Sequence, residues 1–273
     1  LGKVLRIDRN GDAPATNPFA TSGGRCNTTG RTTVGTQCQE TFASGLRNPF
    51  RIAFDTNDTS TRFFINDVGQ NTWEEINAGI PGADYGWNVR EGNCVAGSLD
   101  DCGPPPPGMT NPIWSYAHDE GCSSITGGAF VPSGVWPDTY SGSYLFGDYV
   151  CGSIFALTPS VNGFTRTTLA SDLGTGSAVH LAFGPSGATQ ALYYTTYAGG
   201  GQVRRISDTG TSNRPPVAAV TATPTAGPTP LTVTFDGSGS SDPDGDPLIY
   251  RWTFGDGSAV AETSIPQITH VYS

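Results

Sequence analysis

The sequence predicts an all-β chain in which part of a β-propeller is followed by a smaller β-sandwich. Three observations lead to this prediction. The 273 residues include 37 Gly and 21 Pro, too many for a helical protein. Strand-like segments recur in pairs that are separated by turns. The composition also changes near residue 210, where a short polar linker ends in two prolines.

Charge and hydropathy exclude several classes of function. The formal net charge is -10, and thirteen of the fourteen basic residues are Arg. A surface this acidic repels phosphate backbones, so we expect no nucleic-acid partner. No apolar run approaches the roughly 18 residues of a membrane helix, so we expect no membrane insertion. Hydrophobic residues at 36% still allow a core.

The six cysteines indicate an oxidising compartment, so we expect a secreted, extracellular or periplasmic protein. Six cysteines allow 15 pairings, and sequence alone does not choose among them. Short loops favour neighbours, which gives the expected pairs Cys26–Cys38, Cys94–Cys102 and Cys122–Cys151. The alternative is a zinc site, which the lack of a CxxC motif and the three scattered His disfavour.

The first 208 residues repeat one unit, a strand that turns into a second aromatic strand. The opening GKVLRID, residues 2–8, matches GQVRRIS, residues 201–207, at most positions. Repeated units of this kind predict the radially packed, four-stranded blades of a β-propeller. An irregular sandwich or barrel is the alternative. The units are RIAFDTND with RFFINDVG, GAFVPSG with SYLFGDYVCGSIFAL, and HLAFGPSG with ALYYTTYAGGGQVRRIS.

The length of residues 1–208 is short for a closed propeller. Blades take roughly 40–50 residues, and a propeller has at least about four of them. This part of the chain contains two clear blades, a partial blade at its start and one more near its end. We therefore expect further N-terminal blades outside this sequence.

Residues 209–216 read as a linker, and residues 217–273 read as a separate β domain. LTVTFDGS, residues 231–238, and LIYRWTF, residues 248–254, alternate apolar and polar side chains as half-buried strands do. This pattern predicts a sandwich, and we expect it to need further strands beyond residue 273.

Five motifs occur in order over residues 43–157: ASGLRNPFRIAFD, NDVGQNTWEEIN, GADYGWNVREG, GCSSITGGAFVP and GSYLFGDYVCGSIFAL. Together they resemble the glucose/sorbosone dehydrogenase family of secreted six-bladed propellers. The resemblance implies an enzyme that oxidises a sugar by hydride transfer to pyrroloquinoline quinone (PQQ), with calcium as a second cofactor. The family also includes non-enzymatic, hedgehog-interacting-type members. A non-catalytic secreted module that binds carbohydrate or protein is therefore the alternative.

The resemblance places Arg47 and Asn48, in the motif RNP, against the quinone. A guanidinium there stabilises negative charge that develops on the quinone oxygen. The alternative is that Arg47 ties neighbouring blades together. The catalytic His of the family belongs to a blade before residue 1, and His118 is expected to be a loop or rim residue.

The resemblance also implies calcium ligands, because calcium takes oxygen donors. Gly69 and Gln70 match positions that offer backbone carbonyls, and Glu75 and the carbonyl of Tyr85 match a calcium site in aldose dehydrogenases. The alternative for Glu74 and Glu75 is a solvated strand edge. We expect Trp73 and Trp87 to be packing residues rather than sugar platforms.

Two departures from the family concern PQQ, which carries three carboxylates. A Lys that pairs with the cofactor in glucose dehydrogenases is missing near Val150, and two expected arginines are replaced within Ser177–Val179. Lost cations weaken anion binding. We therefore expect weak PQQ binding by this chain.

The C-terminal segment resembles an immunoglobulin-like PKD domain through Trp252, Phe254–Gly257 and His270–Tyr272. Such domains in secreted enzymes act as spacers or bind polymers, which makes a polysaccharide an expected partner. Asp242, Asp244 and Asp246 alternate around a Gly turn and are candidate calcium ligands. A solvated turn is the alternative.

Overall fold

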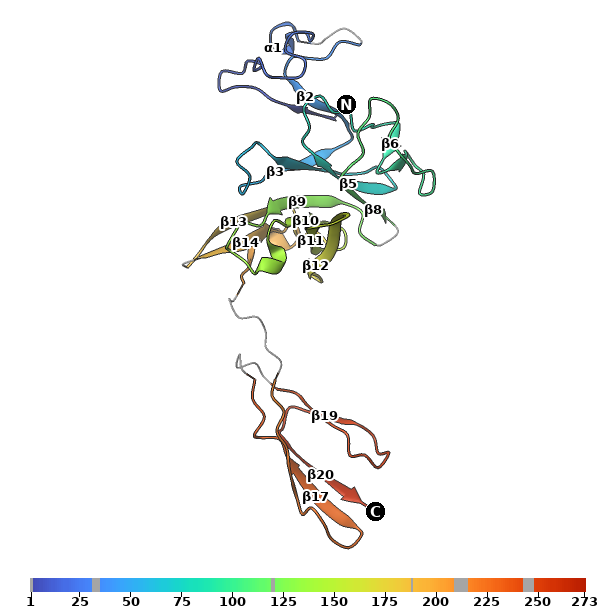
Figure 1. Ribbon diagram of the computed structural model, residues 1–273, viewed down its shortest axis with the longest axis vertical. Coiled ribbons are helices and arrows are strands. Elements are labelled where there is room, and N and C mark those ends of the chain that lie inside the picture. Colours follow the sequence, from blue (N-terminus) through green and yellow to red (C-terminus); the bar gives the residue numbers. More distant parts are fainter. Residues whose placement is uncertain (1, 31–34, 119–120, 188, 209–215, 243–247) are drawn as a thin grey trace. The chain divides into compact units, whose positions relative to one another are not determined.

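The computed structural model describes all residues except 1, 31–34, 119–120, 188, 209–215 and 243–247. It divides into two compact units, Leu1–Asp208 and Thr209–Ser273 (Figure 1). Among the described residues the only α-helix is the single turn α1, Cys26–Thr29. The predicted all-β fold class is thus confirmed. None of the described helices has the length and apolar character that crossing a membrane requires.

The first unit contains two complete blades, each an antiparallel sheet of four strands in chain order (Figure 1). The first blade consists of β3 (Pro49–Phe54), β4 (Phe63–Asp67), β5 (Trp73–Ala78) and β8 (Trp114–Ala117). The second blade consists of β9 (Ile125–Phe130), β10 (Tyr144–Asp148), β11 (Ser153–Ser160) and β12 (Gly163–Ala170). These are the two clear blades that the repeated units predicted.

Smaller sheets accompany the two blades. Strands β1 (Gly2–Leu5) and β2 (Thr41–Leu46) form a pair, and β13 (Leu181–Ser186), β14 (Thr189–Thr195) and β15 (Val203–Ile206) form a three-stranded sheet. A hairpin of β6 (Arg90–Glu91) and β7 (Cys94–Val95) is inserted between β5 and β8. This hairpin was not predicted, because two-residue strands are too short to show a period.

The hydrophobic core lies between neighbouring sheets. Phe64 of the first blade packs against Phe130 and Tyr144 of the second, with ring centroids 4.9 and 5.0 Å apart. Close approach requires glycine in β9, since a Cβ on Gly128 would lie 2.0 Å from the Tyr144 hydroxyl oxygen. The repeated aromatic strands therefore build the interface between the blades.

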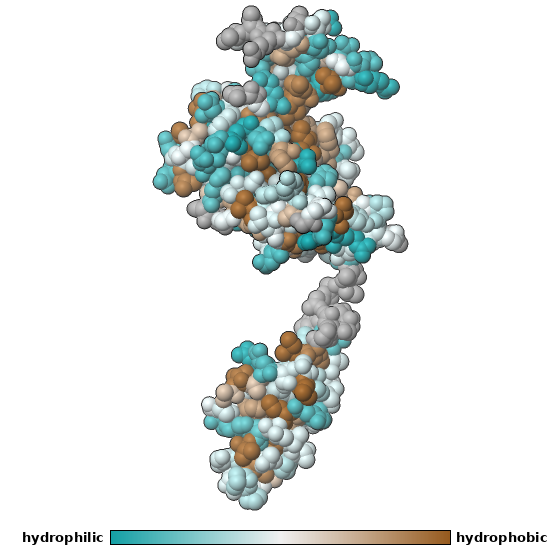
Figure 2. Space-filling view, turned by 180° about the vertical axis from the view of Figure 1, so that it is seen from behind, coloured by the Kyte–Doolittle hydropathy of each residue, from teal (hydrophilic) through white to brown (hydrophobic). Residues whose placement is uncertain are grey.

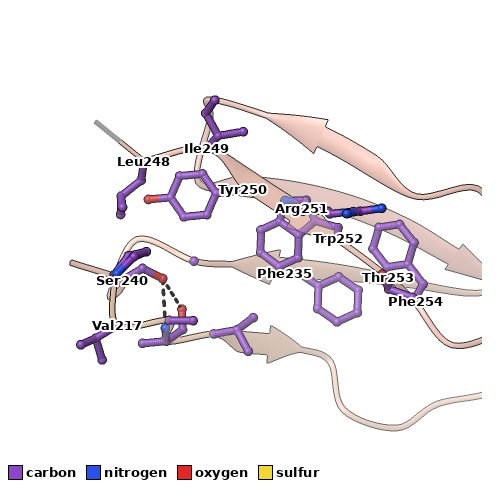
Figure 3. A pocket seen from close by; sticks show the side chains of 15 residues that line it. Val217, Phe235, Ser240, Leu248, Ile249, Tyr250, Arg251, Trp252, Thr253 and Phe254 are labelled. Carbon is purple, nitrogen blue, oxygen red and sulfur yellow. Dashed lines mark hydrogen bonds between the residues drawn. The ribbon is translucent and has the colours of Figure 1, made fainter. Parts of the chain in front are cut away.

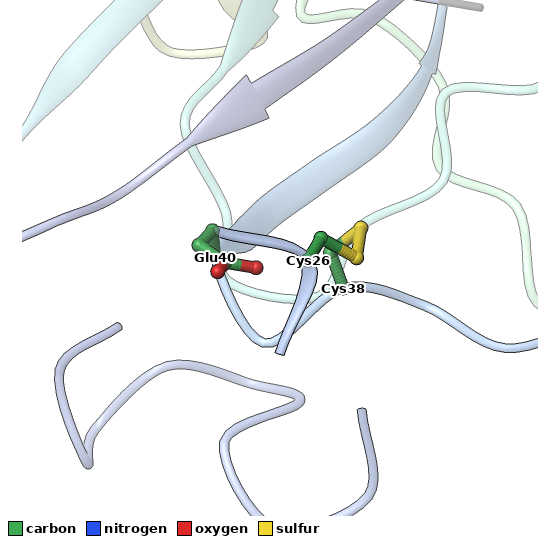
Figure 4. A group of neighbouring side chains, drawn as sticks. All are labelled: Cys26, Cys38 and Glu40. Atoms are coloured by element: carbon green, nitrogen blue, oxygen red, sulfur yellow. A yellow bond between two sulfur atoms is a disulfide. The ribbon is translucent and has the colours of Figure 1, made fainter. Parts of the chain in front are cut away.

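The three predicted disulfides are all present in the structure. Cys26 pairs with Cys38, Cys94 with Cys102, and Cys122 with Cys151. The zinc alternative fails, because the described chain has no free cysteine. In particular, the carboxylate of Glu40 lies beside the sulfur atoms of Cys26 and Cys38, but these sulfurs are bonded to each other (Figure 4).

The second unit consists of two small sheets. One contains β16 (Thr221–Thr223), β17 (Leu231–Asp236) and β20 (Gln267–Tyr272), and the other contains β18 (Tyr250–Trp252) and β19 (Ala261–Thr263). The two parts of the PKD-like motif meet here. Asp256 Oδ2 lies 2.7 Å from His270 Nε2, and the Phe254 ring stacks on the His270 ring at 4.0 Å.

A cavity of about 400 Å³ opens between these two small sheets (Figure 3). Phe235 of β17 and the parallel rings of Tyr250 and Trp252 line it. Strand β18 covers three residues, fewer than the predicted 248–254. Apolar side chains also reach the surface of both units, where Figure 2 shows them as brown patches among hydrophilic residues. Examples are Phe54, which is 59% exposed, and Ile249, which is 77% exposed.

Candidate functional site

Three connections meet at one edge of the first blade, which we call the loop edge. Residues 47–48 lead into β3, residues 68–72 join β4 to β5, and the third connection begins at His118, directly after β8. In an antiparallel sheet these three positions lie at the same end of the strands. Two backbone hydrogen bonds join them, from Val68 N to Asn48 O and from His118 N to Thr72 O.

Asp67, the last residue of β4, clamps the RNP motif. Its Oδ2 accepts the Arg47 N–H at 2.9 Å, and its Oδ1 accepts the Asn48 N–H at 2.6 Å. Burial raises the pKa of Asp67 to about 6, although the two amide donors counteract this effect. The clamp fixes the backbone from which the Arg47 side chain projects.

The Arg47 guanidinium lies on the loop between β4 and β5. Its Nε donates to Gln70 Oε1 at 2.8 Å, and its Nη1 donates to the Val68 carbonyl at 3.0 Å. The group also lies 5.8 Å from the centre of the Trp87 ring. The structure therefore brings Arg47 and Gln70 together within one blade.

Glu91, on the inserted hairpin, organises the same loop. Its Oε1 accepts the amide N–H groups of four consecutive residues, Gln70, Asn71, Thr72 and Trp73, at 2.7, 3.0, 2.9 and 3.2 Å. Burial alone would raise the pKa of Glu91, but the amide donors of this loop lower it to about 2. Glu91 was not selected from the sequence, although it lies within the motif GADYGWNVREG.

Glu75 lies on β5, next to Asp67 in the ladder. Its Oε1 accepts the Gly92 N–H at 2.6 Å and its Oε2 accepts the Asn77 side-chain amide at 3.0 Å. Burial raises the pKa of Glu75 to about 8, and the nearby charge of Asp67 adds to the effect. The solvated-edge alternative is wrong, since Glu75 is 6% exposed and Glu74 is fully buried.

Glu74 faces the opposite side of β5 and holds His118. Glu74 Oε1 lies 2.7 Å from His118 Nε2, and its Oε2 accepts the Ile125 N–H at 2.9 Å. Burial raises the pKa of Glu74 to about 8 and lowers the pKa of His118. His118 is therefore a residue of the loop edge, held by a buried carboxylate that the sequence did not assign to it.

The residues around Glu75 fit a calcium ion. Asn77 Oδ1 is buried and has no hydrogen-bond partner, although Asn77 lies on the same face of β5 as Glu75. An unpartnered buried oxygen beside a buried carboxylate matches the hard oxygen donors that calcium prefers. Tyr85 is 2% exposed, and its hydroxyl donates to the Ala78 carbonyl at the end of β5. Its backbone carbonyl stays a candidate ligand.

The residues fit PQQ less well. Arg47 supplies a cation at the loop edge, but the positions matched to further cationic partners hold Val150 and Ser177–Val179. Val150 is 39% exposed. The Ser177 hydroxyl donates to the Leu173 carbonyl, and the Ala178 carbonyl accepts the Thr126 hydroxyl of the second blade. None of these residues offers a charge to a carboxylate.

Of the remaining predicted residues, some pack the first unit and others belong to the second unit. Trp73 donates its indole N–H to the Ser98 carbonyl at 2.9 Å, as expected of a packing residue. Asp242 belongs to the second unit. Asp244 and Asp246 lie outside the described residues.

Comparisons with known proteins define the class of this chain. The family model "Glucose / Sorbosone dehydrogenase" matches residues 1–175, and the model "PKD domain" matches residues 213–273. The chain therefore belongs to the glucose/sorbosone dehydrogenase family and carries a PKD domain.

Individual relatives are more distant. The chain is 31% identical to the HIPL2 protein of Arabidopsis thaliana over 216 residues, which cover 69% of this chain and 29% of that protein. It is similar in structure to the apo form of soluble aldose sugar dehydrogenase from Escherichia coli, with a TM-score of 0.58, 22% identity, and coverage of 76% of this chain and 54% of that one.

The PQQ-bound form of aldose sugar dehydrogenase from Streptomyces coelicolor matches with a TM-score of 0.51, 20% identity, and coverage of 75% of this chain and 51% of that one. The chain thus spans less than a third of HIPL2 and about half of each dehydrogenase. At these identities the solved structures support the propeller fold.

Proposed function

We propose that the first unit is part of a calcium- and PQQ-dependent sugar dehydrogenase that acts outside the cytoplasm, with the loop edge as its cofactor-binding face. The observation that carries this proposal is the fixed position of the Arg47 guanidinium. Asp67 holds its backbone, and Gln70 and Val68 orient its side chain. A cation fixed in advance stabilises developing negative charge without reorganisation during the reaction.

When bound, PQQ supplies the hydride acceptor for the sugar. The role of this chain would be to position the cofactor and to compensate the negative charge that develops on it. Arg47 would face the quinone oxygen, while Asn48 extends the same clamped turn. No residue of this chain is assigned as the base that takes the sugar proton. Because the His118 ring is hydrogen-bonded to the buried Glu74 carboxylate, its proposed role is to stabilise the loop edge.

Calcium would be held by oxygen donors of the first blade. Glu75 supplies a carboxylate, Asn77 Oδ1 an unpartnered oxygen, and Tyr85, Gly69 and Gln70 backbone carbonyls. A divalent cation would also compensate the buried charge of Glu75, which lies beside Asp67 and Glu91. This compensation supports a structural as well as a cofactor-positioning role for the ion.

The missing cations near Val150 and Ser177–Val179 set the expected affinity for PQQ. Each lost charge-assisted contact is worth about 1.5–3 kcal/mol. Two such losses weaken binding by roughly a hundredfold or more, at about 1.4 kcal/mol per factor of ten. This chain should therefore bind PQQ weakly and oxidise no sugar by itself.

The test is a titration of the chain with PQQ in the presence of calcium, followed by a dye-linked assay of aldose oxidation. We expect weak binding that Arg47→Ala weakens further, and no turnover. Submicromolar binding with turnover would show that the missing cations do not limit binding and that this chain is sufficient for activity. Weak binding that Arg47→Ala leaves unchanged would remove Arg47 from the site.

A non-catalytic module is the second candidate function, and the neutral residues at the cation positions favour it. In this case the propeller and the PKD domain would bind carbohydrate or another protein without redox chemistry. Sedimentation of the chain with insoluble polysaccharides separates the two candidates. Polysaccharide binding without any PQQ-dependent change in absorbance would favour the module.

A further inference from the structure

We infer that Glu91 is a positioning residue that turns the carbonyl oxygens of Gly69 and Gln70 outward, as a preformed pair of ligands for a cation. The inference rests on the proposed calcium site but concerns a residue outside the family-matched ligand set. Glu91 is 2% exposed and accepts four successive amide N–H groups on one oxygen.

The direction of the carbonyls follows from peptide geometry. In a trans peptide the N–H of one residue and the carbonyl of the preceding residue point in opposite directions. The peptide bonds of residues 69–73 are not among the cis bonds of the chain. Because the amides of residues 70–73 point at Glu91 Oε1, the carbonyls of residues 69–72 point away from it.

One of these four carbonyls, that of Thr72, accepts the His118 N–H within the loop edge. In the part of the chain that the structure describes, no backbone amide donates to the carbonyls of Gly69, Gln70 and Asn71. Of these three, Gly69 and Gln70 are the two that the sequence matched to carbonyl donors. Glu91 therefore presents these oxygens before any ion arrives, which lowers the reorganisation that binding requires.

Glycine at position 69 is required by the same arrangement. A Cβ there would lie 1.7 Å from the Trp73 carbonyl and 2.9 Å from Glu91 Oε1. The loop thus folds closely around the carboxylate, and a side chain at this position would push the Gly69 carbonyl out of place.

The second blade offers a matched control. Its Asp148 also collects backbone amides, with Oδ1 accepting from Val150 and Cys151 and Oδ2 from Ser124. The loop that it holds contains the Cys122–Cys151 disulfide and no matched calcium ligand. Asp148→Asn should therefore disturb a loop of similar construction without touching the proposed cation ligands.

The experiment measures calcium affinity by titration calorimetry for the whole chain and for Glu91→Gln and Asp148→Asn. Glutamine keeps the size and one acceptor oxygen but removes the charge that aligns the four amides. We expect Glu91→Gln to weaken calcium binding about tenfold or more, and Asp148→Asn to leave it unchanged while lowering the melting temperature.

Equal affinities of Glu91→Gln and the unmutated chain would overturn the inference and leave the proposed function intact. Absence of calcium binding by the unmutated chain would overturn both. Should Glu91→Gln fail to fold, amide hydrogen exchange of the unmutated chain tests whether Glu91 orders the loop before calcium binds. The amides of residues 70–73 should be strongly protected without calcium, and rapid exchange there would contradict the inference.

Discussion

The two complete blades use the same clamp for different purposes. In each, an Asp ends the second strand and accepts amide N–H groups from the connection that leads into the first strand: Asp67 from Arg47 and Asn48, and Asp148 from Ser124. Around Asp67 the loops carry a guanidinium and free oxygens. Around Asp148 they carry a disulfide and Val150. The scaffold repeats, and the loop contents decide which blade edge can hold a ligand.

Removing the clamp of the second blade should have the largest effect on stability. Asp148 also accepts the Tyr116 hydroxyl at 2.7 Å. Asp148→Ala therefore leaves four hydrogen-bond donors without their acceptor, whereas Asp67→Ala leaves two. We expect losses of about 3–5 and about 2–3 kcal/mol in the free energy of unfolding, respectively. Urea unfolding checks this order, and a larger loss for Asp67→Ala would break the equivalence of the clamps.

The disulfide of the second blade should contribute slightly less. Cys122 and Cys151 are 29 residues apart, so their bond is expected to stabilise the fold by about 3–4 kcal/mol through the closed loop. The double Cys122→Ser, Cys151→Ser variant should unfold at lower urea but bind calcium as before. A loss of calcium binding would show that the two blade edges are coupled.

Sequence patterns predicted the blade strands, which repeat similar side chains, and the disulfides. FFIND and YLFGD gave the second strands of both blades, and cysteine spacing gave the three disulfides. They did not reveal Glu91 or the bond between Glu74 and His118. Glu91 binds backbone amides, and Glu74 and His118 are 44 positions apart in the sequence. Neither contact produces a local periodic pattern of side chains that could predict it.

The helical turn α1 and the hairpin β6–β7 escaped prediction for a related reason. Each lies beside a disulfide, Cys26–Cys38 or Cys94–Cys102, and is too short for its own sequence to determine a conformation. Within the PKD domain the motif residues Phe254 and Asp256 both contact His270, a juxtaposition that their separate sequence positions did not predict.

Arg47 should have the smallest effect on stability. Asp67 holds its backbone amide, and its half-exposed side chain adds only two hydrogen bonds and a ring contact. We expect Arg47→Ala to lower the free energy of unfolding by about 0.5–1.5 kcal/mol. A loss as large as that of Asp148→Ala, measured by the same urea unfolding, would make Arg47 a structural residue rather than a site residue.

The calcium dependence of the melting temperature tests the central claim most directly, that the edge of the first blade is a cation site. Ligand at about 100 times its dissociation constant stabilises a fold by about 2.7 kcal/mol, or roughly 5–10 °C for a unit of this size. We predict this rise for the unmutated chain and for the control Asp138→Ala, at an exposed residue between β9 and β10. We predict its absence in Glu75→Gln. An unchanged melting temperature of the unmutated chain between calcium and chelator would contradict the account.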